Sequence, residues 1–176
     1  MKSTFDLFCF AKNTAPAVKI SGNINRQNNQ LKISYKLEGV SQIIIPKKVN
    51  SLTRQDNLWE HTCFEFFIGL KDSTKYWEFN LSPAGDWNVF RFSNYRQCMS
   101  EEVAFESLPL NVLQQANSLQ LQSEVDLNQI ISLQQSLAVG VTTVIKDQKQ
   151  QLSYWALTHR GKEADFHHRD SFMINL

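Results

Sequence analysis

Three stretches in the middle of the chain, Trp59–Ile68, Tyr76–Ser82 and Trp87–Phe92, alternate between large apolar and polar residues. Successive side chains of a β-strand point to opposite faces, so antiparallel pairing would sort these residues by kind. One face is expected to stack Phe64, Phe66, Phe79, Leu81, Phe90 and Phe92. The opposite face, called the front face below, is expected to gather His61, Glu65, Tyr76, Glu78, Asn80, Trp87 and Arg91.

Strand-like runs recur from end to end, and turn residues separate many of them. Between two of the central stretches, Pro83 presets its own backbone angle and Gly85 is free to adopt positive φ, which favours a tight connection. A single segment indicates a helix: Leu127, Ile130 and Ile131 follow a possible Asp126 cap at helical spacing. The pattern predicts an all-β, antiparallel β-sandwich with one short helix.

Length and charge limit the alternatives. The 176 residues are expected to form a single domain, 1–176, with a sizeable core. A formal net charge of +1 and scattered charges give no electrostatic footprint for nucleic acid or an anionic membrane. No secretory signal or spanning segment is evident, so we expect a cytoplasmic protein. Cys9, Cys63 and Cys98 lack metal-type spacing and are expected to be buried thiols.

The front face carries the first candidate site. Across neighbouring strands, Glu65, Glu78 and Arg91 could form a row of two carboxylates and a guanidinium. Trp59 and Trp87 would offer flat apolar platforms beside it, and Asn80 further hydrogen bonds. Sugars require both kinds of partner, because their hydroxyls bind polar groups while their C–H faces pack on aromatic rings. The alternative is structural: a cross-strand ion pair covered by a loop, with the tryptophans serving as packing.

Other chemistry has weaker support. Metal binding is suggested by His61, His159, His167 and His168, but their spacing favours surface or strand-capping roles. No hydrolase, nucleotide-binding or metalloprotease motif is present. Glu65 and Glu78 could act as a glycosidase pair, yet a neighbouring arginine would keep both ionised. We therefore expect a binding module without enzymatic activity.

Three blocks of sequence carry a family resemblance: 58–67 (LWEHTCFEFF), 76–87 (YWEFNLSPAGDW) and 153–157 (SYWAL), with Asp165-Phe166-His167 near the carboxyl end. Together they resemble the DOMON-like domains of stand-alone bacterial proteins, which are related to family-9 carbohydrate-binding modules. The resemblance implies an antiparallel β-sandwich of immunoglobulin-like or jelly-roll-like outline with a ligand pocket on one sheet. The matching positions are Trp59, Glu65, Glu78, Asn80, Trp87 and Arg91.

The function predicted from sequence is non-catalytic binding of a small polar ligand, a saccharide, with no cofactor. The alternatives are a haem- or metal-binding DOMON-type protein and a protein-interaction module with an unknown partner. For haem, the sequence offers histidines, Met99 and Met173 as axial ligands.

Overall fold

The computed structural model describes residues 2–11, 13, 15–47 and 52–176. In this part of the chain, extended structure dominates, and twelve strands form one sheet. The strands are β1 (Lys2–Cys9), β2 (Lys19–Gln27), β3 (Gln30–Glu38), β4 (Cys63–Leu70), β5 (Tyr76–Leu81), β6 (Trp87–Phe92), β7 (Ser100–Glu101), β8 (Leu110–Gln114), β9 (Ser118–Asp126), β10 (Leu137–Lys146), β11 (Leu152–Ala156) and β12 (Ile174–Asn175).

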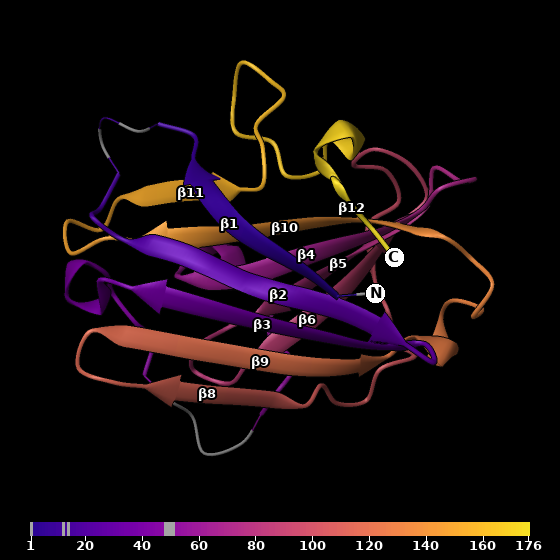
Figure 1. Cartoon of the computed structure of the whole chain (residues 1–176), viewed down its shortest axis with the longest axis horizontal. Helices are drawn as coiled ribbons and strands as arrows, with labels where there is room; N and C mark the ends of the chain where they lie inside the picture. Colours follow the sequence, from indigo (N-terminus) through magenta and orange to yellow (C-terminus); the bar gives the residue numbers. More distant parts are fainter. Residues whose placement is uncertain (1, 12, 14, 48–51) are drawn as a thin grey trace.

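The sheet is antiparallel throughout and runs in the order β7-β6-β5-β4-β10-β11-β1-β2-β3-β9-β8, with β12 beside β10. Strand β1 joins the two halves: its Lys2–Leu7 part pairs with β2, while Phe8 and Cys9 pair with β11. The sheet curls on itself, so that β2, β3 and β9 lie over β4, β5 and β6 (Figure 1). The predicted all-β, antiparallel class is confirmed, but the strands form one continuous curled sheet.

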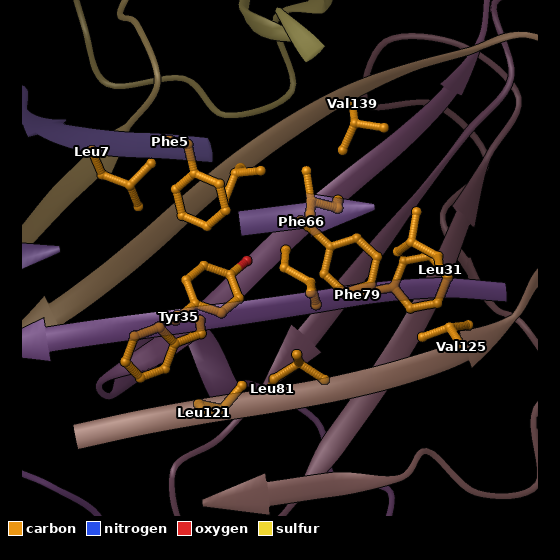
Figure 2. Packing of buried hydrophobic residues seen from close by; sticks show 14 of the residues in the cluster. Phe5, Leu7, Leu31, Tyr35, Phe66, Phe79, Leu81, Leu121, Val125 and Val139 are labelled. Carbon is orange, nitrogen blue, oxygen red and sulfur yellow. The ribbon is translucent and has the colours of Figure 1, made fainter. Parts of the chain in front are cut away.

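The core lies between the two halves of the sheet (Figure 2). Phe66 and Phe79 stack face to face with ring centroids 4.4 Å apart. Tyr35 from the opposite half packs on Phe64 at 5.1 Å, and its hydroxyl donates to the backbone oxygen of Glu65 at 2.7 Å. This hydrogen bond ties β3 to β4 across the core. It therefore also helps to position the face of β4 that points away from the core.

The predicted facing of β6 is wrong. Leu81 pairs directly with Trp87, and Glu78 pairs with Phe90. Directly opposed residues share a face, so Trp87 points into the core with Leu81, whereas Phe90 joins Glu78 on the front face. The connection from Ser82 to Asp86 sets this register, because Ser82 and Asp86 close the turn through a backbone hydrogen bond of 2.8 Å.

The predicted short helix is absent from the described residues. Leu127–Gln129 forms only a 3-10 turn, although Asp126 does cap it by accepting from the backbone N–H of Asn128 at 3.0 Å. Asn29 donates its side-chain N–H to the carbonyl of Ile131 at 2.7 Å. This contact satisfies the Ile131 carbonyl, which lies just after the turn.

The cysteines divide by position. Cys9 and Cys63 are buried free thiols, as expected, whereas Cys98 is exposed in the loop between β6 and β7. Its side chain lies outside the sheet, so the expectation of burial is wrong for this residue. In the described ranges, no helix is long and apolar enough to cross a membrane.

Candidate ligand pocket

The front face of β4, β5, β6 and β10 is covered at its edges by two segments. One is the turn Leu58–Glu60, and the other is the segment 157–173 that follows β11. Between them lies a cavity of about 680 Å³. Its aromatic lining comprises Trp59, Phe67, Phe92, Tyr154 and Phe166. Its ionisable lining includes Glu60, Glu65, Glu78, Arg96, Glu163 and His167.

Glu65 lies at the base of the cavity and is only 2% exposed. Its Oε2 accepts from the Thr142 hydroxyl of β10 at 3.2 Å. Its Oε1 is buried and accepts no N–H or O–H donor among the residues described. Burial, and then the charge of Glu78, raises the pKa of Glu65 well above its usual range, while the Thr142 hydroxyl and the Cys63 thiol act weakly in the other direction. Burial therefore favours the neutral form of the Glu65 carboxyl.

Glu78 is the diagonal neighbour of Glu65 on β5. Its Oε1 accepts from the side-chain amide of Asn80 at 3.0 Å. Burial raises the pKa of Glu78 to about 7, although the Asn80 hydrogen bond and the charge of Arg96 both lower it. The cavity base therefore holds two carboxyls with raised pKa values, that of Glu78 lying at about 7.

His167 closes one side of the cavity. Its Nδ1 lies 2.9 Å from the Tyr76 hydroxyl, which accepts the backbone N–H of Arg96 at 3.1 Å. The Tyr76 proton is thus directed to Nδ1, and the neutral imidazole carries its own proton on Nε2. That Nε2 faces Glu78 Oε2 at 3.7 Å. Burial lowers the pKa of His167 to about 4, so this contact is not an ion pair at neutral pH.

Asp165 holds the covering segment in place. Its carboxylate accepts the Tyr95 hydroxyl at 2.7 Å, an Arg96 guanidinium N–H at 3.0 Å and the backbone N–H of His167 at 3.1 Å. These hydrogen bonds lower the pKa of Asp165, and burial only partly opposes them. Arg96 is therefore paired with Asp165, while its charge still lowers the pKa values of Glu78 and His167.

Aromatic rings form the walls. Trp59 is half-buried and packs edge-on against Phe90 with centroids 5.8 Å apart. Tyr154 of β11 meets Phe166 at 5.9 Å, also edge-on. Tyr154 is 39% exposed, so the wall that it forms remains open to solvent.

The structure brings together three of the six predicted site residues. Trp59, Glu65 and Glu78 line the cavity. Asn80 is fully buried and reaches a ligand only through Glu78, to which its amide donates.

The other two predicted site residues lie on the opposite side of the sheet. Trp87 is 1% exposed in the core, and the Arg54 guanidinium lies 4.4 Å from its ring centroid. Arg91 is exposed, and its Nε donates to Ser100 Oγ at 2.9 Å. Neither the predicted row of Glu65, Glu78 and Arg91 nor the alternative Glu78–Arg91 ion pair forms. The cause is the register of β6 described above.

The sequence pattern did not identify Tyr154, which lines the cavity, or Thr142, which hydrogen-bonds Glu65. Both lie on strands far along the chain, and only the sheet order brings them to the site. The cluster of carboxyl-terminal histidines did point to the covering segment, but His167 is its only member that lines the cavity. His159 contacts the Phe8 carbonyl at 2.8 Å, and His61 is exposed. Nowhere in the described ranges do three or more His, Cys, Asp or Glu side chains gather as metal ligands.

Comparison with known proteins gives structural relatives only. No family model matches the sequence, and no curated protein matches it. A proposed carbohydrate-binding protein from Bacteroides uniformis ATCC 8492 superimposes with a TM-score of 0.71 at 14% identity, covering 97% of this chain and 84% of that one. A family-9 carbohydrate-binding module from Caldicellulosiruptor kristjanssonii, solved with glucose, superimposes with a TM-score of 0.54 at 8% identity, covering 92% and 77%. The chain therefore shares the fold of these two structures.

Two side chains that could ligate haem iron, Met99 and His167, line the cavity. Nδ1 of His167 is hydrogen-bonded to Tyr76, and Nε2 lies 3.7 Å from Glu78 Oε2. An iron bound to Nε2 would therefore lie against the Glu78 carboxyl. The acidic base of the cavity would also oppose the carboxylates that haem itself carries.

Proposed function

We propose that this protein is a non-catalytic module that binds a saccharide in the cavity between Trp59, Glu65, Glu78 and His167. The observation that carries the proposal is Glu65, which lines the cavity and whose buried Oε1 has no N–H or O–H partner in the described part of the chain. Buried polar groups in native proteins are nearly always satisfied, so an unmet acceptor in a cavity indicates a ligand hydroxyl or amine. The proposal includes that the chain is a DOMON-like domain, as its sequence resemblance suggests.

The walls and the base suit the two surfaces of a sugar. Trp59 and Tyr154 supply flat apolar area on which the C–H face of a pyranose can pack. The neutral Glu65 carboxyl can both donate and accept, and Glu78 accepts more strongly as it ionises. The fold similarity to two carbohydrate-binding structures supports this assignment.

The arrangement of the carboxyl groups supports binding over catalysis. Glycosidases place two carboxyl groups on either side of the scissile bond. Glu65 and Glu78 instead project from neighbouring strands into the same base of the cavity. A sugar lying on this base would meet both groups from one side.

Calorimetric titration with mono- and oligosaccharides tests the proposal. Trp59→Ala and Glu78→Ala are each expected to weaken binding about tenfold, because they remove a stacking surface and an ionisable hydrogen-bond acceptor respectively. Arg91→Ala is the matched control, since its exposed side chain lies on the other side of the same sheet. Wild-type affinity in both cavity variants, or an equal loss in the control, would show that the sugar binds elsewhere. A protein that binds no saccharide of the panel would contradict the proposal outright.

A further inference from the structure

The cavity is strongly acidic. Four of its lining residues are glutamates: Glu60, Glu65, Glu78 and Glu163. The single lining arginine, Arg96, binds Asp165 at 3.0 Å, so its charge is already matched. No lysine is among the lining residues. A cationic ligand is the chemical complement of such a lining.

The two carboxyl groups at the base of the cavity, Glu65 and Glu78, have no cation in direct contact among the described residues. The groups that face Glu65 are the Thr142 hydroxyl, the Cys63 thiol and Glu78, with the Tyr35 hydroxyl on the backbone oxygen. None of these groups is a cation. Because two neighbouring buried carboxyls repel each other when both ionise, the unmet Oε1 is a place where a positive charge would be stabilised.

Glu78 likewise lacks a cation in direct contact among the groups that face it. The groups that face it are Asn80, the neutral imidazole of His167 and, at longer range, Arg96. The Tyr76 hydroxyl holds the His167 ring through a hydrogen bond to Nδ1. The region between Glu65 Oε1 and Glu78 Oε2 therefore offers two acceptors to a donor-rich group and no competing donor stronger than an imidazole N–H.

We propose that the pocket selects saccharides that carry a protonated amino group, such as a hexosamine, with the ammonium held between the Glu65 and Glu78 carboxylates. This inference rests on the proposed function, because it names the class of sugar that the same cavity takes. An ammonium presents three donors and no acceptor, which matches a base made of carboxylate oxygens. The aromatic wall at Trp59 adds cation–π attraction. N-acetylation removes the charge and adds bulk, so an N-acetylated sugar loses both contributions.

Binding of an ammonium also has a proton signature. In the free protein, the raised pKa values of Glu65 and Glu78 favour the protonated carboxyls near pH 6.5. The amine is charged at this pH, because amines of the α-amino type titrate at about 7.7–8.0. Pairing with the ammonium stabilises the ionised carboxylates, so binding releases protons to the buffer. A neutral sugar that only forms hydrogen bonds releases none.

Glucosamine, glucose and N-acetylglucosamine are titrated by calorimetry near pH 6.5 in two buffers of different ionisation enthalpy. Glucosamine is expected to bind about tenfold tighter than the other two and to release protons. Glu65→Gln and Glu78→Gln each preserve side-chain shape and are expected to reduce both the preference and the release. Glu124→Gln, which lies outside the cavity in an exposed ion pair with Lys32, is the control and is expected to change the affinity by less than about threefold.

The outcomes separate this inference from the proposed function. Glucose binding as tightly as glucosamine, or a preference that survives both glutamine substitutions, overturns the inference and leaves saccharide binding intact. Failure of all three sugars overturns the proposed function as well. Cyclohexylamine serves as an amine without sugar hydroxyls. If it binds as tightly as glucosamine, the saccharide part of the assignment is wrong.

Discussion

Replacing Trp87 with alanine is expected to lower the free energy of unfolding by about 3–5 kcal/mol, the range for truncating a large buried aromatic side chain. Trp87 is 1% exposed, pairs directly with Leu81 and fills the core beneath β6. Truncation would also remove the ring under the Arg54 guanidinium, which lies 4.4 Å from its centroid. Urea unfolding followed by circular dichroism measures the change.

Trp87→Phe is the informative companion variant. It keeps most of the packing and removes an indole N–H that is buried without a partner in the described structure. Losing an unsatisfied donor offsets part of the lost volume, so we expect a clearly smaller destabilisation than for alanine. A Trp87→Ala protein as stable as wild type, but impaired in sugar binding, would place this indole on the front face and refute the register of β6.

Stability is expected to fall as the pH rises from about 6.5 to 8. The pKa of Glu78 is raised from 4.5 to about 7 in the folded protein, and that of Glu65 is raised well above its usual range. A carboxyl with a raised folded-state pKa stabilises the protein fully at low pH, and this contribution is lost as the pH rises through the folded value. Each proton that differs between the folded and unfolded states contributes a slope of about 1.4 kcal/mol per pH unit.

His167 acts with the opposite sign. Its pKa is lowered from 6.5 to about 4, so its contribution is present above pH 6.5 and is lost as the pH falls through 4. Between pH 4.5 and 6.5 this effect cancels that of Glu78, so Glu65 alone leaves a net decline of about one proton. Above pH 6.5 the two carboxyls act together and the decline steepens, until the pH passes about 7 and Glu65 alone continues it.

Unfolding curves from pH 5 to 8.5 for wild type and Glu65→Gln test this expectation. The amide cannot ionise, so the variant should show a flatter decline and gain on the wild type as the pH rises. Glu124→Gln provides the control, because Glu124 forms only an exposed ion pair with Lys32. Stability that rises over the alkaline range, or an unchanged slope in Glu65→Gln, would mean that the Glu65 carboxyl is not a neutral buried group.

The sequence pattern was sufficient for β4 and β5 and misleading for β6. In β4 and β5 the core positions and the acidic positions differ sharply in polarity, so parity assigns Phe66 and Glu65 to opposite faces correctly. Strand β6 carries large apolar side chains on both faces, Trp87 and Val89 on one and Phe90 and Phe92 on the other. Its facing is then decided by the register of the preceding turn, which hydrophobicity does not encode.

Local sequence patterns also did not predict which segments cover the site. Glu65 and Glu78 were identified because they interrupt apolar runs within paired strands. Thr142, His167 and Tyr154 meet them only through contacts that are distant in sequence, such as the Thr142–Glu65 pairing of β10 with β4. The buried Phe172 and the half-buried His167 show that the carboxyl-terminal segment folds over the sheet, whereas its histidines had suggested surface roles.

The most direct test of the pocket is a two-dimensional ¹H–¹⁵N spectrum of the indole N–H groups during saccharide titration. The chain has four tryptophans: Trp59, Trp77, Trp87 and Trp155. Only Trp59 lines the cavity, so its indole resonance is expected to shift with saturation while the other three stay in place. A shift at Trp87 with Trp59 unmoved, under conditions where calorimetry shows binding, would contradict a saccharide site on the front face.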